Sequence, residues 1–264
     1  MKARSQDFWF ELFAIVLIVI VVQGIYATVV RPQAEAERAD DLAAMQRDPQ
    51  YVPKASPWVV VKDYEQETCF ILALWACAIM GRKALSIGRN RKLLDTEVLH
   101  LAEGMKILPE DTREYARQVE ALPAENRWQL LPRALTAALQ RFAATRNIQD
   151  VSTAARAVCE TESDRLESEL SMVRFVAWSI PAIGFVGTVR GIGQSLQQAH
   201  RAVEGDVSGV VSGLGVAFNS TLVALLLSIL VMFMLHQIQL RQERLVLDIE
   251  EYLDERVVRH MVVR

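Results

Sequence analysis

The sequence has few of the residues on which metal proteins and many enzymes depend. It contains three cysteines and four histidines among 264 residues, and none of them has the spacing of a metal site. Cys69 and Cys77 lie in an apolar run, where cysteine usually fills space in a helix. There is no nucleotide-binding loop and no pairing of a nucleophile with a base. We therefore expect no catalytic residues, no metal, no cofactor and no enzymatic activity.

An excess of positive charge is also missing, because 32 acidic residues outnumber 29 basic ones. A nucleic acid is thus not an expected partner. Alternation of apolar and polar residues, which would indicate strands, is absent as well. What the chain has is apolar sequence: 52% of its residues are hydrophobic and 23% are charged. This composition agrees with a membrane protein that has a substantial aqueous part. Together with the apolar segments described below, it predicts an all-α integral membrane protein with four transmembrane helices and long helical extensions in the cytoplasm.

The first 81 residues predict a membrane hairpin. Residues 9–30 are long enough to cross a bilayer, and Lys2 and Arg4 before them favour a cytoplasmic N-terminus. Cleavage of this segment as a signal peptide near Ala27 is the alternative. Residues 31–57 are polar and contain several prolines, which predicts a partly irregular external loop. The second span is predicted at about 64–81, since the apolar run 69–80 is too short to cross alone.

A basic cluster directly follows the second span and consists of Arg82, Lys83, Arg89, Arg91 and Lys92. Because lysine and arginine accumulate on the cytoplasmic side of membrane proteins, residues 82–173 are predicted to form a cytoplasmic helical region. A second helix pair is predicted over 174–237, with spans at about 174–196 and 209–236. Residues 238–264 then carry apolar side chains at helical spacing, which predicts a cytoplasmic C-terminal helix. Four crossings place both termini in the cytoplasm.

The third predicted span contains glycines spaced three and four residues apart, Gly184, Gly187 and Gly191. In a bilayer such spacing marks a close contact between helices. Pro181 lies on the same span and removes a backbone donor, so it is expected to kink the helix. We assign these four residues to helix packing and bending.

Hydroxyl groups occur at matching positions on the last two spans. From a rise of about 1.5 Å per residue, Thr188 and Thr221 are both predicted near the middle of the bilayer. Polar side chains at that depth usually face a bundle interior or an ion path. Thr188, Thr221, Asn219 and Ser220 are therefore candidate residues of an ion pathway. The alternative for each hydroxyl is a bond to the carbonyl one turn earlier in its own helix.

Two motifs here resemble a known family. Pro-Ala-Ile-Gly-Phe-Val-Gly-Thr-Val-Arg-Gly-Ile, which begins at Pro181, resembles the Pro-x-x-Gly-x-x-Gly-Thr-x-x-Gly-[Met/Ile] signature of the MotA/TolQ/ExbB proton channel family. Ala-Phe-Asn-Ser-Thr-Leu-Val-Ala-Leu, which begins at Ala217, is similar to that family's motif Ala-Leu-x-x-Thr-x-x-Gly-Leu on the last membrane helix. The resemblance covers roughly the last third of the chain.

The resemblance implies a homopentamer in the bacterial inner membrane, around a dimer of a single-span partner similar to ExbD, TolR or MotB. A membrane aspartate of that partner would carry the proton, and proton influx would be coupled to mechanical work in the cell envelope. Neutralisation of the aspartate would weaken its contact with one Thr188/Thr221 pair and let the pentamer rotate to the next. A sodium-driven version of the same motor and a non-conducting membrane scaffold of the same fold are the alternatives.

Two positions depart from the family pattern. Arg190 stands where better-known members carry an apolar or aromatic residue, and it lies about 200° around the helix from Thr188. We expect it to reach the outer interface or to pair with Glu204 or Asp206 in the following loop; an Arg190 that faced the pore would oppose cation passage. Val216 stands where some members carry a glutamate. Among the spans that are apolar throughout, Glu11 is the one acid and it lies near an edge, so a carboxylate at mid-membrane is expected from the partner.

The predicted topology has a direct test. Cysteines introduced as Glu120→Cys and Met45→Cys would lie in the cytoplasmic region and in the external connection, respectively. A membrane-impermeant thiol reagent added from outside should therefore label position 45 and leave position 120 unmodified. Labelling of position 120 from outside would show that the orientation inferred from the basic cluster is wrong.

Overall fold

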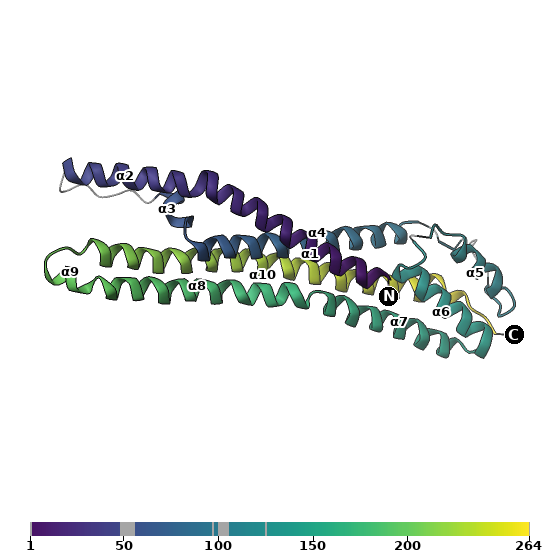
Figure 1. Cartoon of the computed structure of the whole chain (residues 1–264). Coiled ribbons are helices and arrows are strands. Elements are labelled where there is room, and N and C mark those ends of the chain that lie inside the picture. Colours follow the sequence, from purple (N-terminus) through teal and green to yellow (C-terminus); the bar gives the residue numbers. More distant parts are fainter. Residues whose placement is uncertain (1, 48–55, 97, 100–105, 125, 264) are drawn as a thin grey trace. The chain divides into compact units, whose positions relative to one another are not determined.

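The fold is described from a computed structural model of the chain, for residues 2–47, 56–96, 98–99, 106–124 and 126–263. These residues are almost entirely helical (Figure 1). They divide into two compact units, residues 1–80 with 172–235 and residues 81–171 with 236–264. Helices α4 (Tyr64–Leu94) and α10 (Ser208–Arg256) contribute residues to both units.

The first unit begins with a helix that is longer than the sequence predicts. Helix α1 (Lys2–Ile25) continues through a π-helical turn, η1 (Tyr26–Val30), into α2 (Arg31–Arg47). The predicted irregular connection 31–57 is therefore helical as far as Arg47, and residues 48–55 lie outside the described part. Pro32 lacks an amide hydrogen and its ring crowds the preceding turn. The π turn directly before it loosens that turn, and the alanine, glutamate and arginine residues after it favour a helix.

Helix α4 packs against this first helix. Ser56 caps the short helix α3 (Pro57–Val61) by accepting a hydrogen bond from the amide of Trp58 at 3.2 Å, and α4 starts three residues after α3. An apolar cluster joins the two sides and consists of Val22, Tyr26 and Val30 with Ile18, Trp58, Val61, Phe70 and Ile71. The indole Nε1 of Trp75 also donates to the carbonyl of Glu11 at 3.1 Å. The predicted hairpin of residues 1–81 thus has a packed interface in the structure.

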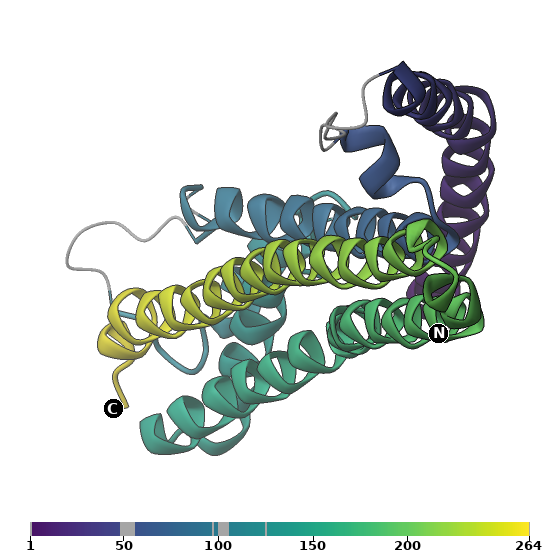
Figure 2. The ribbon, with the colours of Figure 1, turned by 90° about the vertical axis from the view of Figure 1, so that its left-hand side faces the viewer.

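Helices α8 (Ser171–Gln197) and α10 form the other half of the first unit. They are antiparallel neighbours, connected by a loop that contains the short helix α9 (Ala199–Val203), as Figures 1 and 2 show from two directions. Figure 2 also shows α4 beside α10, and Cys77 Sγ of α4 lies 3.8 Å from Met234 Sδ of α10. A three-helix contact of α4, α8 and α10 therefore holds the residues of the candidate pathway.

Four helical segments are long and apolar enough to cross a membrane: Trp9–Met45, Tyr64–Leu94, Ile148–Gln197 and Ser208–His260. Many large apolar side chains on these helices are exposed, among them Phe13, Phe185 and Phe233. Such a surface would be a liability in water and is suited to lipid. In the described residues strand geometry is limited to one isolated bridge. The predicted fold class, an all-α membrane protein with four candidate spans, is confirmed.

The second unit has a helical core of its own. It contains α5 (Thr112–Glu120), α6 (Leu130–Thr145) and α7 (Ile148–Glu169) together with the ends of α4 and α10. Helix α6 buries the residues that share one of its faces, Leu131, Leu135, Leu139 and Phe142. Arg146 ends α6 in a left-handed conformation, and Asn147 caps α7 by accepting from the amide of Gln149 at 2.9 Å.

The C-terminal helix is shorter than predicted. Helix α10 ends at Arg256, and a single 3-10 turn, η2 (Val258–His260), follows it. The chain then pairs with Ile107: the Ile107 amide donates to the carbonyl of His260 at 2.7 Å, and the Val262 amide donates to the carbonyl of Ile107 at 3.1 Å. Ile107 and Met261 are buried in this bridge. The last turns of the predicted C-terminal helix are therefore absent, and the chain forms this bridge in their place.

Candidate ion path between α8 and α10

The two helices approach each other through small residues only. Gly184, Gly187 and Gly191 of α8 are buried against Ala224, Ser220 and Ala217 of α10, respectively. A Cβ atom on Gly187 would lie 2.6 Å from Ser220 Oγ, and one on Gly191 would lie 2.5 Å from the Ala217 amide nitrogen. These distances leave no room for a methyl group. The glycines thus allow a backbone contact that larger residues would prevent.

This close approach brings Thr188 and Thr221 together. Their hydroxyl oxygens are in direct hydrogen-bond contact between α8 and α10. Thr188 Oγ1 also lies 3.3 Å from the carbonyls of Gly184 and Ala217, and Thr221 Oγ1 lies 3.3 Å from the carbonyl of Gly184. Both side chains are half-buried in the single chain. The pair therefore has one side packed between the helices and another side open to a further molecule.

The pair has more acceptors than protons. Each hydroxyl carries one hydrogen. Thr188 has two carbonyls and the other hydroxyl within reach, and Thr221 has one carbonyl and the other hydroxyl. The back-bond of Thr188 to its own helix, the alternative foreseen from the sequence, is one of these contacts. It coexists with bonds across the interface. The hydroxyls can therefore exchange partners within the pair, and they can donate to an acceptor that approaches from the open side.

Ser220 and Asn219, the two polar residues before Thr221, do not join the hydroxyl pair. Ser220 is buried, donates to the Val216 carbonyl at 2.8 Å and lies 3.4 Å from Nε2 of Gln66. Its hydroxyl is therefore part of the helix contact. Asn219 lies two residues from Thr221, about 200° around α10, so it faces away from the pair. Neither threonine hydrogen-bonds to it in the structure. Of the four residues predicted for the pathway, the structure brings two, Thr188 and Thr221, into contact through their hydroxyls.

Pro181 lies inside α8. Because proline has no amide hydrogen, the carbonyl of Ala177 one turn earlier loses its helical donor. Ser228 Oγ of α10 lies 3.3 Å from that carbonyl. A free carbonyl is costly where water is excluded, so this hydroxyl compensates for the proline. Sequence reasoning did not find Ser228, because its role depends on which residue of α10 faces Ala177.

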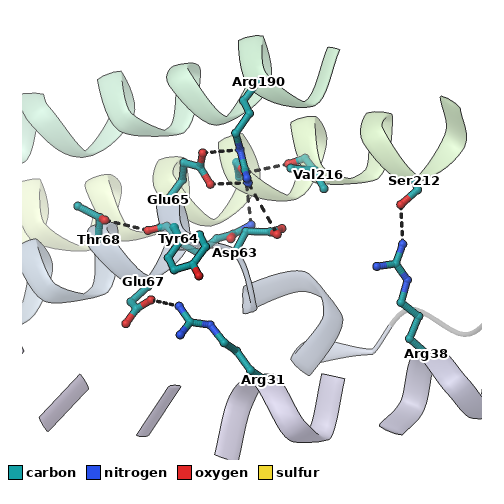
Figure 3. A network of polar contacts seen from close by, with 12 residues as sticks. Arg31, Arg38, Asp63, Tyr64, Glu65, Glu67, Thr68, Arg190, Ser212 and Val216 are labelled. Carbon is teal, nitrogen blue, oxygen red and sulfur yellow. Dashed lines mark hydrogen bonds and ion pairs between the residues drawn. The ribbon is translucent and has the colours of Figure 1, made fainter. Parts of the chain in front are cut away.

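Arg190 has partners other than the predicted ones (Figure 3). Its Nη2 lies 2.7 Å from one carboxylate oxygen of Glu65 and its Nε lies 2.7 Å from the other. Asp63 lies 3.8 Å from Nη2. The expected pairing with Glu204 or Asp206 is therefore wrong. Asp206 instead accepts from the hydroxyl and the amide of Ser208 at 2.5 and 3.1 Å, which holds the pKa of its carboxyl below its usual range.

Three consecutive residues at the start of α4 contact three different helices. Glu65 binds Arg190 of α8, Gln66 reaches Ser220 of α10, and Glu67 accepts from Arg31 at the start of α2 at 2.5 Å. Successive residues point about 100° apart on a helix. For that reason Arg190 and Arg31 approach α4 from opposite sides in Figure 3. Carboxylates in a first turn are also favoured by the helix dipole.

A carboxylate of α4 lies beside the turn of α8 that carries Thr188. A Cβ atom on Gly187, the residue before Thr188, would lie 3.3 Å from Cγ of Glu65. Glu65 thus contacts the same turn of α8 that carries Thr188. The sequence alone does not single out Glu65. The available signal was a set of acids at the start of one apolar helix and an unpartnered arginine within another.

The described residues contain no group of three or more histidine, cysteine or acidic residues that could hold a metal ion. Cys159 of α7 is a free thiol that is fully buried in the structure.

Part of the chain matches a known protein family. Residues 127–251 match the MotA/TolQ/ExbB proton channel family, the family that the two motifs resemble. The matched segment includes Thr188, Thr221 and the glycine contacts, whereas Arg31, Asp63 and the acids of α4 lie outside it. Neither a curated protein nor a solved structure matches the chain.

The glycine contact predicts a strong difference between two glycines of the same helix. Gly187→Ala would place a methyl group against Ser220, whereas a Cβ on Gly193 would meet nothing within 4 Å. Gly187→Ala should therefore destabilise the protein by about 1–3 kcal/mol, as overpacking does, and Gly193→Ala should not. Thermal unfolding of the detergent-solubilised variants measures the difference. Equal stability of the two variants would contradict the close approach of α8 and α10.

Proposed function

On the premise that residues 127–251 belong to the MotA/TolQ/ExbB proton channel family, we propose that this chain is the ion-conducting subunit of a membrane motor. Membership of that family supports a channel or motor role in a membrane. The finer proposal is that proton influx is coupled to mechanical work in the cell envelope. The observation that carries it is the hydroxyl contact of Thr188 with Thr221 between α8 and α10.

The hydroxyl pair needs a titratable partner. Threonine hydroxyl groups neither take up nor release a proton near neutral pH, but they can donate a hydrogen bond to an ionised carboxylate. We propose that a single-span protein similar to ExbD, TolR or MotB supplies a membrane aspartate to the open side of the pair. Hydrogen bonds to an ionised acceptor are roughly twice as strong as neutral ones. Protonation of the aspartate would therefore weaken its contact with Thr188 and Thr221.

A ring of such sites would convert this weakening into motion. We propose five copies of the chain around a dimer of the partner, so that a neutralised aspartate can leave one threonine pair for the next. Transfer of one charge across the membrane supplies about 2.3 kcal/mol per 100 mV. That energy is comparable with the contact that each step must break. The half-buried state of both threonines in the single chain supports access from a neighbouring subunit.

The proposed setting is the bacterial inner membrane, with both termini and residues 82–173 in the cytoplasm. The basic cluster after the second span supports this orientation, because it follows the apolar part of α4. Inward proton flow would then enter from the side of the loop that contains α9 and leave on the cytoplasmic side. This direction is the one that an inwardly directed proton gradient requires.

Two alternatives each have an observation in their favour. Two hydroxyls and two carbonyls lie together at the threonine pair, and oxygen ligands of this kind also suit sodium. A scaffold without conduction is favoured by Val216, which stands where some family members carry a glutamate. Flux that requires sodium would favour the sodium-driven motor over the proton-driven one. A complete lack of ion flux would favour the scaffold.

Loss of either hydroxyl should stop conduction while assembly persists. Thr188→Val and Thr221→Val keep the shape of the side chain and remove the oxygen, and Thr221→Ser keeps the oxygen. Proton flux is measured in vesicles that contain the chain and the single-span protein that copurifies with it. Each valine variant should lose at least about 90% of the flux, since one positioned hydrogen bond contributes tenfold or more. Thr221→Ser should retain most of the flux.

A matched control for these variants is Thr68→Val. Thr68 is an exposed threonine of α4 whose hydroxyl donates only to the carbonyl of Tyr64, one turn earlier in its own helix. Its loss should leave flux unchanged. Unchanged flux in Thr188→Val and Thr221→Val would eliminate the ion path and favour the scaffold. Flux that requires sodium in place of protons would assign the same site to the sodium-driven motor.

A further inference from the structure

Arg190 presents an electrostatic problem for a cation path. It lies two residues from Thr188 on α8, and its side chain is about one-third exposed. A guanidinium is always charged in proteins. At an effective dielectric constant of about 20, a unit charge several ångströms away opposes a cation by enough to reduce its occupancy tenfold or more. A site that binds or passes cations next to Arg190 therefore requires compensation of this charge.

The structure supplies that compensation from α4. Glu65 faces Arg190 with both carboxylate oxygens, and Asp63 adds a second carboxylate at 3.8 Å (Figure 3). The side chains of Glu65 and Asp63 are 10% and 17% exposed, so solvent screens them little. Two carboxylates therefore face one guanidinium. The other charged pair at the start of α4, Glu67 with Arg31, lies on the opposite side of the helix.

The location of Glu65 connects this ion pair to the hydroxyl pair. Its Cγ lies against the turn of Gly187, and the Gly187 turn also contacts Ser220. Thr188 and Thr221 are the next residues along α8 and α10. Moreover, Gln66 anchors the same turn of α4 to Ser220. The carboxylate is thus held at the level of the threonines by contacts with both helices that carry them.

We propose that Asp63 and Glu65 are positioning residues, which neutralise Arg190 and hold it off the path so that a cation can reach Thr188 and Thr221. This inference rests on the proposed function. It assigns to α4, which lies outside the segment that matches the family, a role in admitting cations to the site. It also explains how the chain combines an arginine at position 190 with a cation path.

The test removes the two carboxylates and then the arginine. In Asp63→Asn/Glu65→Gln the guanidinium of Arg190 has no neutralising partner, so proton flux in the vesicles should fall at least about tenfold. Addition of Arg190→Gln removes the uncompensated charge and should restore most of the flux. Addition of Arg190→Lys keeps the charge and should not restore it. If the carboxylates contributed packing alone, the triple variant with Arg190→Gln should conduct less than the double variant, because it has lost still more contacts.

Glu67→Gln is the matched control, since it removes a still more buried carboxylate from the other side of α4. It leaves Arg31 stacked on Tyr64 with the guanidinium carbon 4.5 Å from the ring centroid, and flux should stay at the wild-type level. Flux is expressed per assembled complex, as measured by size-exclusion chromatography. If the double variant does not assemble, Glu65→Gln alone replaces it. Because Asp63 remains near Arg190, a smaller loss that Arg190→Gln reverses is then expected.

Two results would overturn the inference. One is wild-type flux in Asp63→Asn/Glu65→Gln, and the other is a triple variant with Arg190→Gln that conducts no better than the double variant. Failure of the proposed function has a different signature, because Thr188→Val and Thr221→Val would then leave flux unchanged. Loss of flux in those valine variants together with full flux in Asp63→Asn/Glu65→Gln would refute only the role of the carboxylates.

Discussion

Helices α8 and α10 touch through glycine, alanine and serine, and a methyl group on Gly191 would lie 2.5 Å from the backbone of α10. Apolar side chains gain little from leaving lipid for one another, so membrane helices associate through such close packing. The other features of the site depend on this contact. It brings two threonine hydroxyls within hydrogen-bond reach, and it places Ser228 where the carbonyl freed by Pro181 needs a donor.

The same constraint explains the polar residues at the start of α4. A charged or amide side chain within an apolar bundle is costly unless it has a partner. Glu65, Gln66 and Glu67 point in three directions and meet an arginine, a serine and an arginine, respectively. Each contact fixes α4 to a different helix. Glu65 and Gln66 thus hold α4 against the two helices that carry the hydroxyl pair, whereas Glu67 fixes α4 to α2 on the other side.

Local patterns were sufficient to predict much of the fold. The apolar runs, the family motifs and the spacing of Gly184, Gly187 and Gly191 predicted a helical membrane protein and a contact between its last two membrane helices. The meeting of Thr188 with Thr221 followed from counting the rise per residue along antiparallel helices. The π turn before Pro32 and the end of α10 at Arg256 were missed, because both depend on backbone adjustments that a periodic pattern does not record.

The partner of Arg190 was missed for a different reason. Residues 63 and 190 are far apart in the sequence, and the pairing depends on which turn of α4 lies level with Gly187. Loop acids near Arg190 in the sequence were the obvious candidates, but Asp206 is occupied by Ser208. The depth of Glu65 likewise could not be deduced, because the polar residues at the start of α4 resemble an ordinary membrane boundary.

The central claim is that Thr188 and Thr221 act as one unit in conduction. A double-mutant cycle on proton flux tests it most directly, with Thr188→Val, Thr221→Val and the two combined in the same vesicles. Residues that act as a unit are strongly non-additive. We predict that the proton flux of the double variant is no lower than that of the single variant with the lower flux. A loss equal to the product of the two single losses would show that the threonines act independently and would contradict the claim.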